Sequence, residues 1–429
     1  MASLIVFSTF LVLFALRVPV TTAIGVGCVA ALLAGGGSLQ EIPRHMMGGI
    51  ESFILLAIPF FVLAGNLFNA GGATARLFSF CEVVFGRMPG GLAQVSVAAN
   101  VVFSGMSGAA LADLAGLGTM TVKAMREAGY RERFAAAVAL ASSVLGPIIP
   151  PSIMFVIYAA STSTSIGRLF MAGVGAGLVI ALILMAYIAI VVLAGWEPCP
   201  PARRHTLKDA ARQTWMALPA LLAPVVILGA MRAGAVTATE AGVLAVFYAV
   251  VLGAIYRGFT RHNLKTALVS STVMSASILY LIAISGVMGH ILTADRVAHA
   301  AAEAMTSITT NPLVGMLILN VAMLVIGCVL ETTPALLITA PILTPIAAAY
   351  GVDPVHFGII MCLNLIIGIV HPPMGIGLFV MSSVTRVSME EMTRATLPFL
   401  IPLLLSLLVI TYVPAISMWL PDLVFGKTK

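Results

Sequence analysis

The stretch Gly146-Pro147-Ile148-Ile149-Pro150-Pro151-Ser152 interrupts an otherwise apolar region of the chain. A second stretch, Gly368-Ile369-Val370-His371-Pro372-Pro373-Met374-Gly375, interrupts another apolar region, and the offset from Pro150 to Pro372 is 222 (372 − 150). Proline lacks a backbone N–H and breaks a helix, so both regions are predicted to be broken helices. Paired helix breaks in two halves of a membrane protein are the best sequence indication of a transport site.

The composition is that of a membrane protein with many spans. Hydrophobic residues make up 60% of the 429 residues and charged residues only 9%. Apolar windows long enough to cross the ~30 Å hydrocarbon core recur along the chain. Residues 1–16 lack a basic start and a small-residue cleavage site, so we expect a retained first span. The net charge of +6 reflects the placement of loops and does not indicate nucleic acid.

The motifs of several enzyme classes are missing. The sequence contains no GxxxxGK[ST], HExxH or GxSxG pattern, which argues against an ATP-driven pump and against the commonest intramembrane hydrolases. The five cysteines are scattered without a CxxC spacing, so we interpret them as small core residues rather than metal ligands or disulfides. We therefore do not expect an enzyme.

Two apolar stretches, about 90–126 and 311–349, are broken near their middle. Their arms of about 15–18 residues are short for a full crossing. We interpret both as re-entrant helical hairpins, whose tips must be covered by protein or by a water-filled cavity. Broken helices are expected after them, at 131–160 and 354–384. The other spans are expected at about 3–16, 18–34, 51–70, 168–195, 216–232, 237–256, 266–292 and 396–420.

Basic residues gather on one side of these spans. With the N-terminus outside, the inner segments carry 16 Lys and Arg and the outer segments 6, Arg168 among them, as the positive-inside rule requires. The first hairpin then enters from the cytoplasm and the second from outside, so the two halves are inverted. We expect a first repeat at 1–195, a cytoplasmic connector at 196–214 and a second repeat at 215–429.

A gapless alignment of the chain with itself at this offset supports the repeat. Only 7 of 57 positions are identical between 105–161 and 327–383, which is near chance for so biased a composition. Five of the seven are glycine or proline at a tip, a loop or a break. The pairs are Gly105 and Gly327, Gly129 and Gly351, Gly146 and Gly368, Pro150 and Pro372, and Pro151 and Pro373.

The first hairpin tip, Ser104-Gly105-Met106-Ser107-Gly108, has the chemistry of a cation site. Glycines let the backbone turn sharply and leave carbonyl groups unpaired, and serine hydroxyls add further acceptors. Beside the break at 146–152, the tip offers five or six hard oxygen ligands, which suit an alkali cation. The alternative is tight helix packing through small residues. The inverted copy favours the cation site.

The second tip, Gly327 to Pro334, carries Thr332 and Thr333 as hydroxyl donors and Glu331 as an ionisable residue at membrane depth. A carboxylate there is costly unless it faces a cavity or a partner. Asp113 is its rough counterpart on the first hairpin. Both could tune ion or substrate binding, or could cap backbone amides and pair with a base.

Asn66, Asn100, Asn364 and His371 lie in apolar runs. A polar side chain there usually hydrogen-bonds a neighbouring helix. Asn364 lies one turn before the second break, opposite Ser142 in the repeat, so it is slightly favoured as part of a site. His371 could titrate, although a lone membrane histidine is more often structural. Glu240, in Thr237-Ala238-Thr239-Glu240, indicates the start of a helix.

As a set, these motifs resemble the large membrane subunit of tripartite ATP-independent periplasmic (TRAP) transporters, the DctM-like subunit. The resemblance rests on 104–113, 146–152, 237–241 and 371–375 and covers essentially the whole chain in order. It implies an elevator-type transporter of a bacterial inner membrane, in which a block with two hairpins slides against a scaffold. It further implies a small four-helix membrane subunit, a periplasmic substrate-binding protein, surrounding membrane lipid and an organic acid as substrate.

The resemblance also implies sodium, Na+, as coupling ion, held near the tips and breaks. Carried over, the ligands of one ion are Ser104, Gly105, Ser107, Gly108, Gly146 and Pro150; those of another are Gly327, Thr332, Thr333, Gly368, Pro372 and Met374. Candidates for substrate binding are Asp113, Ser152, Glu331, Asn364 and His371. The moving block is expected at about 71–165 and 297–390, with a scaffold of 1–70, 168–195 and 216–292.

Three alternatives stay open at this point. A self-sufficient dicarboxylate symporter or antiporter of similar architecture needs no binding protein. A membrane-embedded enzyme requires a clustered catalytic set, whereas Asp113, Glu331 and His371 lie on separate elements. A channel fits poorly, because paired hairpins indicate alternating access rather than an open pore.

Overall fold

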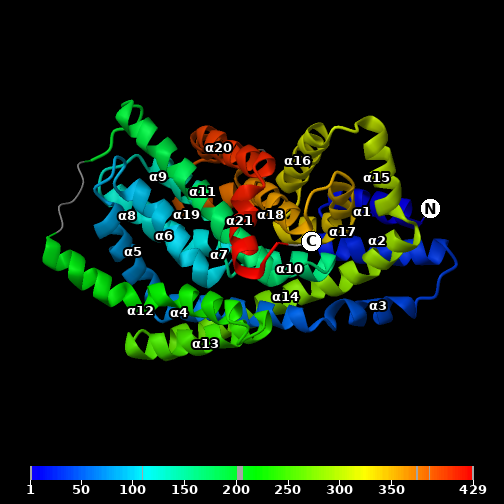
Figure 1. The fold of residues 1–429 in the computed structure, drawn as a ribbon, viewed down its shortest axis with the longest axis horizontal. Coiled ribbons are helices and arrows are strands. Elements are labelled where there is room, and N and C mark those ends of the chain that lie inside the picture. Colours follow the sequence, from blue (N-terminus) through cyan, green and yellow to red (C-terminus); the bar gives the residue numbers. More distant parts are fainter. Residues whose placement is uncertain (1, 109, 201–205, 373–374, 386, 428–429) are drawn as a thin grey trace.

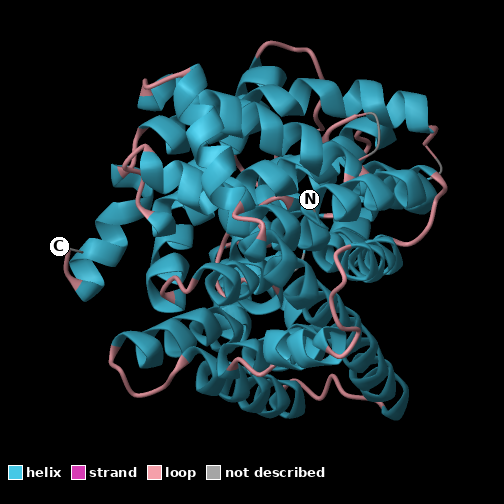
Figure 2. Ribbon diagram, turned by 90° about the vertical axis from the view of Figure 1, so that its right-hand side faces the viewer, coloured by secondary structure: helices cyan, strands magenta, loops and turns pink. Residues whose placement is uncertain are grey.

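The chain folds into helices throughout the part that the computed structural model describes, which is residues 2–108, 110–200, 206–372, 375–385 and 387–427. Figures 1 and 2 show these helices packed at several angles, joined by short loops. Eight helices within those ranges are long and apolar enough to cross a membrane. The protein is therefore an all-α polytopic membrane protein, as expected.

Long helices form one layer, which runs along the lower part of Figure 1. Within it α4 packs against α13 and α14, α3 against α14, and α12 against α13, while α1 and α2 pack on α14 at one end. We call this set the long-helix layer. Its members are α1 (Ala2–Ala15), α2 (Val20–Ala34), α3 (Glu41–Ile50), α4 (Ala57–Ala70), α12 (Leu207–Arg232), α13 (Ala238–Ile255) and α14 (Arg261–Ala294), with a 3-10 turn at Phe53–Leu56.

Capping boxes start three helices of this layer. Thr237 accepts a hydrogen bond from the N–H of Glu240, and the Glu240 carboxylate accepts one from the N–H of Thr237. The helix start predicted at Glu240 is confirmed. Thr206 with Asp209 and Thr260 with Asn263 begin α12 and α14 in the same way. Each box satisfies backbone donors that the first turn leaves without helical partners.

The two hairpins and two broken helices form the second body, which we call the hairpin block. The first hairpin is α6 (Leu92–Ser107), α7 (Ala110–Asp113), a π-helical segment Leu114–Gly118 and α8 (Thr119–Glu127). The first broken helix is α9 (Glu132–Ser143) and α10 (Ile153–Thr162). The second half repeats this order with α16 (Pro312–Val329), α17 (Thr332–Ala349), α18 (Pro354–Val370) and α19 (Ile376–Thr385).

The helix ends repeat with the offset that the sequence indicates. The outward arms α6 and α16 end at positions 107 and 329, the return arms α8 and α17 end at 127 and 349, and α9 and α18 begin at 132 and 354. Each pair shows the same offset as Pro150 and Pro372 (329 − 107, 349 − 127 and 354 − 132). The halves therefore share one succession of helices, although the return arm is interrupted in the first hairpin and continuous in the second. The outer limits of the two repeats stay a prediction. The cytoplasmic connector at 196–214 also stays a prediction, and its residues 201–205 lie outside the described residues.

The remaining helices cover the hairpin block. They are α5 (Ala73–Phe85), α11 (Ile166–Leu193), α15 (Val297–Ile308), α20 (Met389–Tyr412) and α21 (Ala415–Phe425). Arg168, expected in an outer segment, lies in the first turn of α11, is buried and bonds to α21. Its guanidinium lies 2.6 Å from the Asp422 carboxylate and donates to the Gly426 carbonyl at 2.7 Å. These contacts do not decide on which side of the membrane Arg168 lies, so its place among the outer segments stays a prediction.

Candidate functional site

The first broken helix is interrupted where the sequence predicts. The α9 helix ends at Ser143, α10 begins at Ile153, and all residues between them are buried. Ser152 caps α10, since its hydroxyl oxygen accepts from the N–H of Phe155 at 3.3 Å. The same hydroxyl donates to the Pro147 carbonyl. Ser152 thus holds the break in shape, and its predicted contact with substrate stays a prediction.

The first hairpin tip lies directly on this break. Gly108 has a φ of +65°, and a Cβ on it would lie 2.5 Å from the Pro151 carbonyl oxygen. A Cβ on Gly105 would lie 2.6 Å from Pro224 of α12 and 3.7 Å from the Pro150 carbonyl. Only glycine allows so close an approach of two backbones. The tip therefore contacts both the break and the long-helix layer.

Asp113 meets the same break from the return arm. A Cβ on Gly146 would lie 2.5 Å from Oδ2 of Asp113, whose side chain is 1% exposed. The π-helical segment Leu114–Gly118 follows at once, and π-bulges of this kind often mark functional positions. The structure thus brings together Ser104, Gly105, Gly108, Asp113, Gly146, Pro150 and Ser152. The side chain of Ser107 lies outside the described residues.

Buried polar side chains join this hairpin to the broken helix. The Ser96 and Ser142 hydroxyls lie 2.9 Å apart, and the Asn100 amide donates to Ser142 at 3.2 Å. The Ser104 hydroxyl donates to the Asn100 carbonyl. The side-chain oxygen of Asn100 is buried and receives no hydrogen bond from the described residues. It is therefore open to a cation or a water molecule.

In the second half, asparagine side chains make the corresponding connection between the hairpin and the broken helix. The Asn364 amide donates to Oδ1 of Asn320 at 2.8 Å, and the Asn320 amide donates to Thr411 at 3.0 Å. Asn364 is fully buried and occupies the position in the second half that corresponds to Ser142 in the first. Within the described chain its Oδ1 also receives no hydrogen bond. Asn364 therefore connects hairpin and broken helix while keeping one oxygen available. The sequence interpretation did not single out Ser96, Asn320 or Thr411.

The second tip and break meet through two glycines. A Cβ on Gly368 would lie 2.2 Å from the Gly327 carbonyl, so α16 and α18 touch backbone to backbone. The α18 helix continues to Val370, and His371 then leaves the helical path. Nδ1 of His371 lies 3.1 Å from Sγ of Cys328 on the tip. Pro372 follows at the break, whereas Pro373 and Met374 lie outside the described residues.

The first turn of α17 supplies the predicted hydroxyl groups of the second tip. Thr332 is its buried first residue and Thr333 is half-buried. Glu331 precedes them as the N-cap and is exposed on the surface of the chain. A carboxylate exposed at membrane depth needs water or a partner beside it. Glu331 is thus placed at the tip, directly before the first turn of α17.

The two sites belong to one interlocked body. The α19 helix packs against α9, where a Cβ on Gly377 would lie 2.6 Å from Leu140. The α10 helix packs against α17 and α18, and the Tyr158 hydroxyl donates to the Pro354 carbonyl at 2.8 Å. Each broken helix therefore sends its second segment into the opposite repeat.

Helix ends give this centre its electrostatic character. The carboxyl ends of α6 and α9, and of α16 and α18, bring partial negative charge and free carbonyls to the tips and breaks. The amino ends of α10, α17 and α19 bring partial positive charge and free N–H groups. The arrangement can hold cations and an anion close together, as broken transporter helices do.

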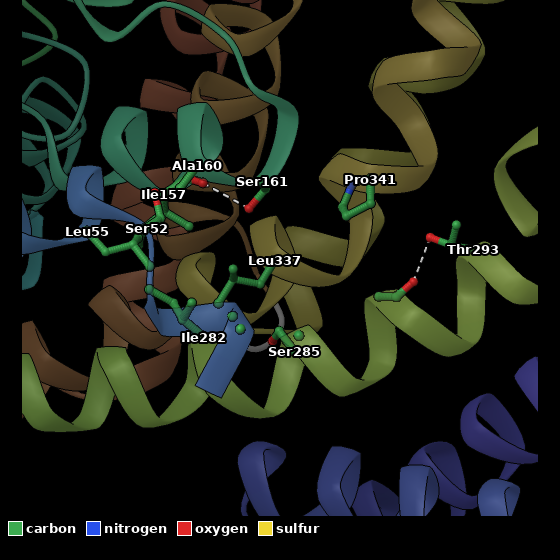
Figure 3. A pocket seen from close by; sticks show the side chains of 14 residues that line it. Ser52, Leu55, Ile157, Ala160, Ser161, Ile282, Ser285, Thr293, Leu337 and Pro341 are labelled. Atoms are coloured by element: carbon green, nitrogen blue, oxygen red, sulfur yellow. Dashed lines mark hydrogen bonds between the residues drawn. The ribbon is translucent and has the colours of Figure 1, made fainter. Parts of the chain in front are cut away.

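A cavity lies at one part of the interface between the hairpin block and the long-helix layer (Figure 3). It has a volume of about 330 Å³ and lies between α3, the turn at 53–56, α10, α14 and α17. Serine side chains from both bodies line it, including Ser52, Ser161 and Ser285. The Ser285 hydroxyl is buried and has no hydrogen-bond partner among the described residues. A polar occupant of the cavity, such as water, would satisfy it.

Comparison with known proteins places this geometry in a family. A family model described as "Tripartite ATP-independent periplasmic transporter, DctM component" matches residues 7–416. The sialic acid TRAP transporter large permease protein SiaM of Vibrio cholerae is 38% identical, with 92% of each chain covered. The C4-dicarboxylate TRAP transporter large permease protein DctM of Pseudomonas aeruginosa is also 38% identical, again with 92% of each chain covered.

A third relative is longer than this chain. The isethionate TRAP transporter permease protein DctMQ of Oleidesulfovibrio alaskensis is 37% identical over 97% of this chain, which spans 66% of that protein. Among solved structures, the YdaH transporter of Alcanivorax borkumensis superposes with a TM-score of 0.64 at 16% identity. That match covers 98% of this chain and 99% of the other, and at such low identity it shows a shared fold only.

Proposed function

Because the chain belongs to the DctM family, the large permease subunits of TRAP transporters, we propose that it is the permease of a sodium-coupled importer of small organic anions. The membrane is the inner membrane of a bacterium. One observation carries the proposal: in each half a hairpin tip lies against a helix break, through Gly108 and Pro151 in one and Gly327 and Gly368 in the other.

Sodium suits the ligands available at these two places. The ends of α6, α9, α16 and α18 present carbonyl groups, and the amide oxygens of Asn100 and Asn364 are buried without a partner among the described residues. Hard oxygen ligands without a clustered set of carboxylates favour an alkali cation over a proton relay. The predicted ligand sets around Gly105 and Gly327 are retained as the proposal.

An organic anion suits the helix amino ends. Three of these relatives are named as transporters of sialic acid, C4-dicarboxylates and isethionate. These compounds share a carboxylate or a sulfonate group. The amino ends of α10 and α19 are natural sites for such a group. We therefore propose a small acid with a terminal carboxylate or sulfonate as substrate.

Two partners complete the proposal: a small four-helix membrane subunit and a periplasmic substrate-binding protein. Both follow from the family. The rival is a self-sufficient symporter of the same architecture. Vesicles that contain the chain and the small subunit should take up substrate only when the binding protein is added. Uptake of equal rate by the chain alone would favour the rival.

Movement is proposed to be of the elevator type, with the hairpin block sliding against the long-helix layer. The cavity between them supports this proposal, because an interface that is partly unfilled resists sliding less than a close-packed one. The sequence interpretation placed 168–195 in the scaffold. The α11 helix, however, packs against α6, α18 and α20, so we assign it to the moving body.

The dependence of transport on a sodium gradient is tested in vesicles that hold the permease, its small subunit and the binding protein. We expect uptake under an inward sodium gradient, with half-saturation depending on sodium concentration. A potassium gradient of equal size and a pH gradient without sodium serve as controls. Uptake that persists without sodium and follows the pH gradient would contradict the proposal.

The second ion site is tested with a matched pair of variants on α17. Thr332→Val removes a buried hydroxyl at the tip with little change of shape, so the sodium concentration for half-maximal uptake should rise about tenfold, the cost of one ligand of about 1.4 kcal/mol. Thr339→Val removes a hydroxyl that donates to the Ala335 carbonyl of the same helix, and sodium dependence should be unchanged. Equal behaviour of the two variants would remove Thr332 from the site.

A further inference from the structure

A cluster of metal-ligating side chains lies away from the hairpin tips, where α3 packs on α14. It consists of Glu41 and His45, one turn apart on α3, and His290 near the end of α14. The two imidazole rings are stacked, with centroids 3.8 Å apart and an angle of 16° between their planes. Oε2 of Glu41 lies 3.7 Å from Nε2 of His290. One ligand atom from each residue lies within 4.8 Å of the other two.

The backbone holds these side chains together. A Cβ on Gly49 would lie 3.4 Å from the Cα of Gly286, and a Cβ on Gly286 would lie 2.7 Å from the His45 carbonyl oxygen. The two helices therefore touch backbone to backbone just beside the rings. Movement of α3 or α14 can separate the two rings only if the contact between Gly49 and Gly286 opens. The packing of the two helices thus keeps the three side chains close together.

The ligand atoms of the cluster suit a metal ion. A nitrogen of each ring and an oxygen of Glu41 all lie within 4.8 Å of one another. A neutral imidazole keeps a lone pair on one nitrogen, which is the form that binds metals. Glu41 adds one negative charge. All three residues are half-buried, so the cluster can be reached from solvent.

We propose that Glu41, His45 and His290 bind a transition-metal dication of the zinc class. Two imidazoles and one carboxylate are a common set of three zinc ligands, with a water molecule in the fourth position. Zinc–ligand distances of about 2.0–2.2 Å place tetrahedral ligand atoms roughly 3.4 Å apart. Because an imidazole binds a metal in the plane of its ring, the two stacked rings must rotate out of their stack to point one nitrogen each at a shared ion. A mixed nitrogen and oxygen set of this kind disfavours magnesium and calcium, which take oxygen ligands.

The proposed metal site lies beside one wall of the cavity. His290 is preceded by Gly289, and His45 is followed one turn later by Gly49, and both glycines line the cavity. The cluster lies at the end of α14 that is opposite to Arg261 and Lys265. A bound ion would join α3 to α14 at this end and stabilise the long-helix layer. It is distinct from the hairpin tips, so it is not required for sodium binding there.

The experiment uses the full-length chain in lipid nanodiscs and zinc chloride as probe. Titration calorimetry and elemental analysis should give one zinc per chain, with a rise in thermal stability on zinc addition and none with magnesium. His45→Ala and His290→Ala should each weaken zinc binding by roughly 100-fold, since changing even an outer partner of a ligand costs about 10–100-fold. Glu41→Gln should weaken it by about tenfold.

Two further variants separate binding from folding. His45→Phe with His290→Phe keeps the stacked rings without their nitrogens, so the variant should fold and bind no zinc. His299→Ala is the matched control, because His299 and Glu303 form an exposed pair 3.3 Å apart on α15, and its removal should leave zinc affinity unchanged. The proposal is overturned if the wild type binds no zinc, or if the double phenylalanine variant binds it with unchanged affinity.

Discussion

Individual glycines determine how closely the tips and breaks approach each other. The contact between Gly327 and Gly368 leaves no room for a side chain, because a Cβ on Gly368 would lie 2.2 Å from the Gly327 carbonyl. The sequence could predict that these glycines matter, since each has a counterpart at the repeat offset. It could not predict that they touch each other. That contact depends on how α16 and α18 are rotated about their axes, which composition and spacing leave open.

Gly368→Ala should therefore destabilise the protein by about 1–3 kcal/mol, the usual cost of overpacking a filled interior. Gly229→Ala is the matched control, because Gly229 lies in α12 with nothing within 4 Å of an added Cβ. That substitution should be neutral or stabilising by roughly 0.5–1 kcal/mol. Thermal unfolding in detergent measures both. A Gly368→Ala variant as stable as the control would contradict the contact described here.

Pairs of elements are joined by polar contacts that the sequence only partly indicates. A hydrogen bond to a neighbouring helix was predicted for Asn66, Asn100 and Asn364, and it is confirmed for each. Their partners, such as Asn320, were not identified, because those partners lie far away along the chain. The helices themselves could be predicted from apolar length and from Gly and Pro, since these depend on local chemistry.

The bond between Asn320 and Asn364 should appear as an energetic coupling between α16 and α18. In a double-mutant cycle with alanine at both positions, we expect a coupling of about 0.6–1.7 kcal/mol, the range for polar pairs between membrane helices. Asn66 bonds to Ser271 in the long-helix layer, so Asn66→Ala and Asn364→Ala should be additive. Additivity of the Asn320 and Asn364 substitutions would show that their bond contributes nothing to the packing of the hairpin.

At the scale of the whole molecule, the chain divides into the hairpin block and the long-helix layer, with a cavity between them. The inverted order of helices could be predicted from basic residues and repeated breaks. The cavity could not, because it is formed by side chains from four distant segments, including Ser52, Ile157, Ser285 and Leu337. The proposed sliding movement can therefore be tested at the interface that contains this cavity.

Crosslinking across this interface should arrest transport. In a background without the five native cysteines, Ser161→Cys on α10 and Gly289→Cys on α14 face the cavity from opposite sides. A bismaleimide that joins them should stop uptake. Gly315→Cys with Tyr350→Cys is the control, because both lie within the second hairpin and are in contact, so joining them should leave uptake unchanged. Full crosslinking across the cavity with normal uptake would replace the elevator by local gating.

The brevity of α10 and α19 has a consequence for biogenesis. Each has 10 residues, or about 15 Å of helix, which is half of the ~30 Å that a segment must cross to rest in lipid by itself. The backbone groups freed at the adjacent breaks must meanwhile be covered by protein. Part of the cover for α10 comes from α4 and α11, and part from α17 and α18 of the second half. The α17 and α18 helices are synthesised only after the long helices α11 to α14. The packing around α10 is therefore completed only after the second half of the chain has been synthesised and inserted.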